Sequence, residues 1–177
     1  NGLVTEGLLA EVFSNEGIGT LIYANEYRQI RAAEKKDVAS ILRLSQEAMS
    51  QDRLVERTEK KIAEHLDDYF IYEIDENPIA CVALHHFPNE QTGELAHLFV
   101  NPSHANQGIG LKLVEFIENH ARDIGITRLI TLSTQSFAFF TNKADFNEGN
   151  SSELPPARRA SYEDQGRNSK ILIKHLS

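Results

Sequence analysis

The sequence contains one cysteine, one methionine and no tryptophan. The cysteine, Cys81, lies in the apolar run IACVAL, so an internal disulfide and a thiolate metal cluster are excluded, and we expect this side chain to pack in the core. No stretch approaches the roughly 20 apolar residues that a membrane span needs. The N-terminal NGLVTEGLLAEVF lacks the basic start and the cleavage site of a secretory signal. These absences predict a cytoplasmic protein without a membrane partner.

The chain also lacks an excess of basic residues. Its net charge is −8, which argues against a nucleic-acid partner. The charge is uneven, however, because residues 154–177 hold five Lys and Arg against two Asp and Glu. A basic end on an acidic body suits a small anionic ligand, although a solvated tail has the same pattern. The length of 177 residues, with 41% hydrophobic and 25% charged residues, is typical of one globular domain.

The apolar periodicity predicts alternating helices and strands with short connections. Asp37 and Thr58 are each placed to cap a helix whose apolar residues follow the 3.6-residue period. Strand-like runs separated by turn residues then predict an antiparallel meander. The expected elements are a strand over 27–32, helices that start at Asp37 and Thr58, strands over 69–74, 78–87 and 93–100, a helix over 108–123, a strand over 128–133, a helix over 136–143 and a strand over 170–176.

A glycine loop opens the longest of these helices. The stretch HANQGIGLKL, which contains Gly108 and Gly110, follows the apolar run GELAHLFV after a short connection. Two glycines let backbone N–H groups crowd around a phosphate, and the positive end of the helix adds a favourable field. The loop lacks the Gly-Lys-Ser/Thr of a P-loop, and Leu113 stands where a dinucleotide fingerprint has its third glycine. On these residues alone, the loop fits either a phosphate ligand or a plain tight turn.

Two helices, a three-strand meander and a glycine loop, in this order, resemble the GNAT superfamily of N-acetyltransferases. The superfamily motif Q/R-x-x-G-x-G/A matches residues 105–110, with Ala105 in place of the usual long polar residue. The resemblance implies an α/β (α+β) fold, with a mixed, mostly antiparallel central sheet and helices on both of its faces. It also implies acetyl-CoA as co-substrate, with the loop backbone on the pyrophosphate and the preceding strand facing the thioester. The positions concerned are Gln107, Gly108, Ile109, Gly110 and Leu111 in the loop, and Leu98, Phe99 and Val100 in the strand.

The resemblance narrows to the bacterial N-acetylglutamate synthases. Ordered segments that are similar to that family are LLAEVFSNEGIGTLI, YRQIRAAEKKDVASIL, SQDRLVERTEKKI, GELAHLFVNPSH, LSTQS, ELPPARRASY and GRNSKILI. They imply transfer of the acetyl group to the α-amino group of L-glutamate, the first step of arginine biosynthesis. They further imply that residues 1–24 end an amino-acid-kinase-like domain through which the protein self-associates, and that residues 25–177 form the acetyltransferase domain. The start at Asn1 and the single Met49 agree with this division.

Glu94 is the candidate general base. An α-amino group has a pKa of roughly 8, so it must lose a proton before it attacks a thioester. Glu94 heads an apolar strand, where partial burial would raise its pKa and make it a better base acting through a water, although a solvent-facing strand end has the same pattern. A backbone N–H near Leu98 or Phe99 can meet the oxyanion. By resemblance, Ser133 protonates the leaving thiolate, although serines at strand ends also serve as caps.

Recognition of glutamate requires cations for two carboxylates, which guanidinium groups bind through paired hydrogen bonds. By resemblance, the substrate positions are Leu54, Arg158, Arg167 and Ser169. The family segment L-V-R-R reads Leu54-Val55-Glu56-Arg57 here, so a carboxylate stands where a cation is expected. Three outcomes stay open: Arg57 takes over, the amino acid is held differently, or Glu56 turns to solvent.

The histidines do not predict a metal site. His85 and His86 are adjacent and point to opposite faces of a strand, so no ligand set converges. His97 lies on the face opposite Glu94 if its strand is regular, and a β-bulge would bring it to the substrate. Two rival functions remain: an acetyltransferase for another amino acid or a protein N-terminus, which Glu56 favours, and a non-catalytic acyl-CoA-binding or regulatory module, which Ala105 favours.

Overall fold

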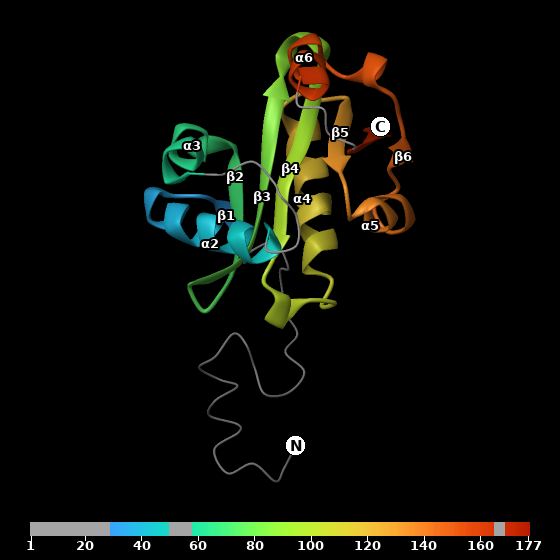
Figure 1. Cartoon of the computed structure of the whole chain (residues 1–177). Coiled ribbons are helices and arrows are strands. Elements are labelled where there is room, and N and C mark those ends of the chain that lie inside the picture. Colours follow the sequence, from blue (N-terminus) through green and yellow to red (C-terminus); the bar gives the residue numbers. More distant parts are fainter. Residues whose placement is uncertain (1–28, 50–57, 165–168) are drawn as a thin grey trace, which may run out of the picture.

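The computed structural model describes residues 29–49, 58–164 and 169–177 (Figure 1). Within these residues a seven-stranded sheet has the order β1-β2-β3-β4-β5-β7-β6. Neighbouring strands are antiparallel except for β4 and β5, which are parallel. This arrangement confirms the predicted mixed, mostly antiparallel sheet. The predicted domain boundary near residue 24 lies outside the described residues.

Most elements agree with their sequence-based prediction to within one residue. The strands are β1 (Ile30–Ala32), β2 (Tyr69–Ile74), β3 (Asn77–Phe87), β4 (Thr92–Val100), β5 (Arg128–Ser133), β6 (Asn147–Glu148) and β7 (Lys170–His175). The helices are α2 (Val38–Met49), α3 (Glu59–Glu64), α4 (Ile109–Asp123), α5 (Phe137–Asn142) and α6 (Pro156–Asp164). Short 3₁₀ turns are η2 (Lys35–Asp37), η3 (Leu66–Asp68), η4 (Pro88–Glu90), η5 (Pro102–His104) and η6 (Ser151–Glu153). The sequence did not predict α6 or β6.

The two predicted helix caps have different outcomes. Thr58 caps α3 as expected, since its hydroxyl accepts a hydrogen bond from the Lys61 N–H at 3.3 Å. Asp37 does not stand at the N-cap of α2 but ends the preceding turn η2, where its carboxylate accepts from the Glu34 N–H at 2.7 Å. The same carboxylate is bound by the Arg31 guanidinium, so it joins β1 to the start of α2.

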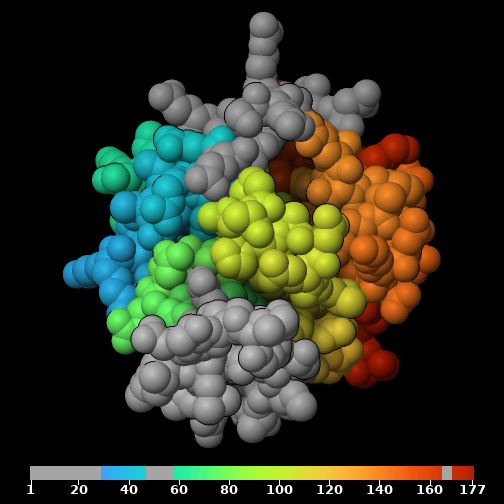
Figure 2. Space-filling view, turned by 90° about the horizontal axis from the view of Figure 1, so that it is seen from below, coloured from blue at the N-terminus to red at the C-terminus, as the bar shows by residue number. Residues whose placement is uncertain are grey.

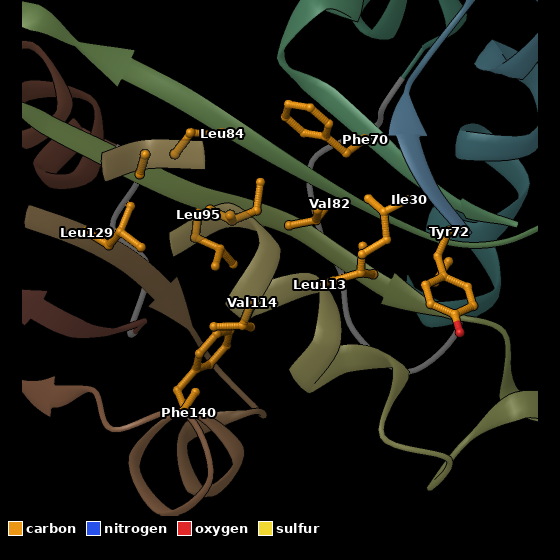
Figure 3. Packing of buried hydrophobic residues seen from close by; sticks show 14 of the residues in the cluster. Ile30, Phe70, Tyr72, Val82, Leu84, Leu95, Leu113, Val114, Leu129 and Phe140 are labelled. Atoms are coloured by element: carbon orange, nitrogen blue, oxygen red, sulfur yellow. The ribbon is translucent and has the colours of Figure 1, made fainter. Parts of the chain in front are cut away.

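Each face of the sheet carries its own core. Helix α4 covers one face, with Leu113 and Val114 packed against Val82 and Leu95 (Figure 3). Helices α2 and α3 cover the other face, where Cys81 is fully buried, as predicted. Figure 1 shows α6 at the end of the molecule where the turn between β3 and β4 lies. Among the described residues no helix is both long and apolar enough to cross a membrane.

Candidate active site

The sheet separates between β4 and β5. The two strands pair in parallel over Thr92–Glu94 and Arg128–Ile130. Past this point β4 follows β3 as far as Val100, while β5 follows β7 as far as Ser133. Because the two strands are parallel, their C-terminal ends lie at the same end of the sheet. The separation therefore opens toward the segments that follow them, the glycine loop and α5.

The glycine loop is shaped by one left-handed residue. Gly108 has φ 79° and stands at the N-cap of α4, and Ile109 after it is buried. The Lys112 N–H donates to the Gly108 carbonyl at 3.1 Å and closes the first helical turn. The N–H groups of a first turn have no acceptor within their helix, so they are available to an anion. Figure 2 shows this segment, in yellow-green to yellow, between the cyan α2 and the orange α5 at one end of the molecule.

Gly110 lets α4 begin close to α5. A Cβ at this position would lie 3.4 Å from Cζ of Phe139 and 3.9 Å from Cγ2 of Val100. Both are ordinary contact distances, so the motif position accepts a small residue but not a large one. The exposed Ala105 and Gln107 precede this turn. The loop contribution to the site is therefore chiefly backbone.

Glu94 lies where β4 leaves β5, and it is 6% exposed. The sequence pattern allowed either a buried carboxylate or one that faces solvent. The structure has the buried arrangement. Nε of Arg158, on α6, donates to its Oε2 at 2.7 Å. The predicted base and a predicted carboxylate-binding residue are thus each other's partner, which the sequence did not indicate.

A cavity of about 700 Å³ contains this ion pair. It lies on the sheet face that α3 and α6 cover, and its lining includes Lys61, Tyr69, His85, Glu94, His97 and Arg158. The lining thus combines cations, a carboxylate and titratable rings. Such a cavity suits a small zwitterionic or anionic molecule.

A β-bulge brings His97 into this cavity. The pairing of β3 with β4 slips by one residue, because Cys81 opposes Phe99 whereas Ala83 opposes Ala96. His97, in the extra stretch, has φ 56°. Its Nδ1 and the Tyr69 hydroxyl lie 2.8 Å apart, and its ring lines the same cavity as Glu94. The conditional prediction of a bulge at this place is confirmed.

A second polar pair, which the sequence did not indicate, has one member, His85, in the lining of the cavity. Nδ1 of His85 lies 2.7 Å from Oδ2 of Asp68, and the His85 ring is 5.6 Å from that of His97. Although these side chains converge, the described part of the chain holds no group of three or more His, Cys, Asp or Glu that could bind a metal ion.

Ser133 lies at the end of β5, opposite Lys170 of β7. It is 9% exposed, and its Oγ accepts a hydrogen bond from the Ser136 N–H at 2.8 Å. A hydroxyl that accepts one bond still has its own proton to donate. Ser169, the other predicted serine, precedes β7, and its carbonyl accepts from the Tyr162 hydroxyl at 2.8 Å. Leu54, Arg57 and Arg167 lie outside the described residues.

Comparison with known proteins gives consistent matches. Residues 35–146 match the family model described as the acetyltransferase (GNAT) family. Proteins named amino-acid acetyltransferase are 36% identical over 99% of this chain in Neisseria meningitidis and 37% identical over 96% in Photorhabdus laumondii. The chain spans 40% and 37% of the length of these two relatives.

Solved structures agree. The N-acetylglutamate synthase of Neisseria gonorrhoeae, in a complex with coenzyme A and N-acetylglutamate, has a TM-score of 0.81 and 34% identity, covering 100% of this chain and 42% of that one. The Ard1 protein of Thermoplasma volcanium shares only the fold, with a TM-score of 0.66 and 13% identity over 84% of this chain and 97% of that one. The mixed sheet, the separation of β4 from β5 and the glycine loop before α4 agree with these matches, and the chain belongs to the GNAT family of acetyltransferases.

Proposed function

We propose that this chain transfers the acetyl group of acetyl-CoA to the α-amino group of L-glutamate. The observation that carries the proposal is the Glu94–Arg158 pair, a buried carboxylate 2.7 Å from a guanidinium, in a cavity beside the point where β4 leaves β5. Acetyl transfer to an amine needs a base that removes the amine proton. Binding of glutamate needs a cation for its carboxylates. Both groups are present in one cavity that has room for an amino acid.

The glycine loop and β4 would hold acetyl-CoA. The left-handed Gly108 and the start of the 15-residue helix α4 offer backbone N–H groups to a pyrophosphate, which needs no long side chain at Ala105. The stretch from Leu98 to Val100 lies past the paired part of β4 and β5, where the backbone can face the pantetheine and the thioester. The predicted loop positions from Gln107 to Leu111 follow after the short segment 101–106.

The acceptor would bind on the cavity side. Nε of Arg158 is engaged by Glu94, but a guanidinium has five N–H donors, so it can bind a substrate carboxylate at the same time. By family resemblance, Leu54, Arg167 and Ser169 bind the rest of the acceptor, and in this proposal Arg57 takes over from the cation that Glu56 replaces. His97 joins them because the bulge directs its ring into the cavity.

The chemical step is a direct attack. Glu94, through a water, takes a proton from the ammonium of the acceptor, and the neutral amine attacks the thioester carbonyl carbon. The tetrahedral oxyanion meets a backbone N–H of β4 near Leu98 or Phe99. The C–S bond then breaks, and the Ser133 hydroxyl donates a proton to the thiolate, which leaves as a thiol. The nitrogen loses its second proton as the amide forms, and this proton returns through water to Ser133.

The test is release of coenzyme A from acetyl-CoA with L-glutamate, compared with aspartate, glutamine and no acceptor. We expect Glu94→Gln to lower kcat by about 10²-fold or more, the usual contribution of a positioned base. Arg158→Lys keeps the charge but loses the two-pronged hydrogen bonding, so it should chiefly raise KM for glutamate. Glu90→Gln, an exposed carboxylate of the preceding turn, is the matched control and should leave both constants unchanged.

Two results would contradict the proposal. If aspartate or glutamine were acetylated faster than glutamate, another acceptor would replace it. If acetyl-CoA bound but no amino acid accelerated its turnover, the chain would be a binding module rather than an N-acetyltransferase for amino acids.

A further inference from the structure

The Asp68–His85 pair resembles the carboxylate–histidine units that enzymes use to handle protons. Oδ2 of Asp68 lies 2.7 Å from Nδ1 of His85, with side chains 34% and 27% exposed. An ionised carboxylate can only accept a hydrogen bond, so Nδ1 carries the proton. A neutral His85 then has its lone pair on Nε2, which is on the side of the ring away from Asp68. The ring is thereby fixed in the tautomer that accepts a proton.

The pair lies next to Glu94. In the antiparallel register of β3 and β4, His85 is directly opposite Glu94, and directly opposed residues have Cβ atoms about 4.5–5.5 Å apart on the same face of the sheet. Both side chains line the same cavity. They are therefore within reach of each other, directly or through one water.

Exposure to solvent increases from Glu94 to His85. The Glu94 side chain is 8% exposed, whereas that of His85 is 27% exposed. After each reaction Glu94 must lose the proton that it has taken, and bulk water has little access to it. His85 offers the step between this buried carboxylate and solvent.

We propose that His85, oriented by Asp68, is a proton relay that returns Glu94 to its ionised form during acetyl transfer. The proposal rests on the proposed function, because it assigns to Glu94 the amine proton. The proton passes from the Glu94 carboxyl to Nε2 of His85, the resulting imidazolium is stabilised by the Asp68 carboxylate, and Nε2 releases the proton to solvent. Charge balances, because a carboxylic acid and a neutral imidazole become a carboxylate and an imidazolium. His85 acts through Glu94 and is a supporting residue rather than a catalytic one.

Other titratable groups surround His85 from each neighbouring element. His65, at the end of α3, has its ring 6.1 Å away, and its Nδ1 is 3.9 Å from Asp68. His97 of β4 has its ring 5.6 Å away and is hydrogen-bonded to Tyr69. The cavity also includes Lys61, Glu64 and Arg158. The pH profile of the wild-type rate would contain contributions from all of these groups. The role of His85 is therefore tested by comparing the pH profiles of the variants with that of the wild type.

The decisive variant is His85→Asn. The Asn amide can donate to Asp68 from nearly the place of Nδ1, so the structural hydrogen bond is kept, but the amide cannot accept a proton from Glu94. We expect kcat to fall by about 10²-fold, the usual size of a lost proton-transfer group, while KM changes little. The kcat profile against pH should lose one ionisation. Asp68→Asn, which removes the charge beside the imidazolium, should give a smaller loss in kcat.

The neighbouring histidine supplies the control. His86 is exposed and, one residue along the strand, points to the opposite face. His86→Asn should leave kcat, KM and the pH profile unchanged. The readout that separates a relay from a structural role is rescue: added imidazoles should restore turnover to His85→Ala, with rates that follow the basicity of the imidazole.

The outcomes are distinguishable. Wild-type turnover with an unchanged rate in His85→Asn would overturn the relay and leave the proposed function intact. A loss of rate with an unchanged pH profile and no imidazole rescue would also overturn it, since it would mark His85 as structural. If the wild type acetylated no amino acid, the proposed function and the relay would fail together.

Discussion

The contact between β1 and the start of α2 predicts a stability that depends on pH. Asp37 is 2% exposed, and its carboxylate binds the Arg31 guanidinium at 2.7 Å to Nη1 and 3.0 Å to Nη2. Nε of Arg31 also donates to Glu73 at 2.8 Å. Replacing Arg31 with Met keeps an unbranched apolar stem but removes every one of these donors. The carboxylate of Asp37 then stays buried and keeps the hydrogen bond from the Glu34 N–H.

The sign of the pH effect follows from the forces on Asp37. Burial raises the pKa of this carboxyl, but hydrogen bonds from Arg31 and from the Glu34 N–H outweigh it and hold the pKa below the ordinary 3.8. A lowered folded-state pKa means that the unfolded chain binds more protons between the two values. The stabilisation is therefore present above the unfolded-state pKa and is lost as the pH falls through the folded-state one. Without Arg31, burial is the largest remaining influence on the pKa of Asp37 and acts to raise it, so the difference in stability between wild type and variant becomes smaller in acid.

The magnitude can be bounded. Removing one partner of a fully buried ion pair costs about 3–5 kcal/mol. Arg31 is 24% exposed, and Asp37 keeps its bond from Glu34, so we expect Arg31→Met to lower the free energy of unfolding by about 2–3 kcal/mol at neutral pH, somewhat less than that range. The deficit should shrink as the pH falls toward and below 3.8, where Asp37 becomes protonated in the unfolded chain.

Urea unfolding followed by far-ultraviolet circular dichroism measures this effect, because the chain has no tryptophan for fluorescence. Wild type and Arg31→Met are compared at neutral pH and in acid. Lys36→Met, which removes an exposed cation from the turn that contains Asp37, is the control and should lower the free energy of unfolding only slightly. A deficit below about 1 kcal/mol, the scale of a surface pair, or one that stays constant with pH, would refute the assignment.

The glycines give further predictions about stability. Gly108→Ala should lower the free energy of unfolding by about 1–2 kcal/mol, because its φ is 79° although nothing lies within 4 Å of the added Cβ. Gly110→Ala, its matched control, should be neutral or stabilising by up to about 1 kcal/mol, since its Cβ meets only ordinary contacts. Gly93→Ala should cost about 1–3 kcal/mol through overpacking, because its Cβ would lie 2.7 Å from Cδ1 of Leu84. Urea unfolding checks all three, and equal effects at the two loop positions would contradict the argument from φ.

The elements that could be predicted are those whose pattern reports burial. Helix α4 buries Leu113, Val114, Ile117 and Ala121 at helical spacing, and the glycine before it marked its start. Ile124, which the same spacing adds to this stripe, is 43% exposed instead. Helix α6 was missed because its sequence, PARRASYED, includes no fully buried residue and hence no apolar stripe. Strand β6 has two residues, both exposed, which is too short for any alternation.

The site shows the same division between local and long-range information. The bulge at His97 could be anticipated only as a condition, because nothing in GELAHLFV marks it. The opposition of His85 and Glu94 depends on the length of the turn. Counting outward from Pro88 and Asn89 places Thr92 opposite His85, whereas the turn continues through Glu90 and Gln91 and brings Glu94 there. The contact between Glu94 and Arg158 joins residues 64 positions apart. No local pattern could predict it, since it depends on how α6 packs over the sheet.

The position of Glu94 connects the fold to the chemistry. It is the last residue of β4 that pairs with strands on both sides, with His85 of β3 and with Ile130 of β5. Its backbone is therefore held firmly, and its side chain is fixed by Arg158. The next residues pair with β3 alone, and within three positions the bulge begins. In the proposed mechanism, Glu94 as the base has to be held still, whereas the backbone that would face the thioester has to be accessible. These opposite needs are met by neighbouring residues of one strand because the sheet separates between them.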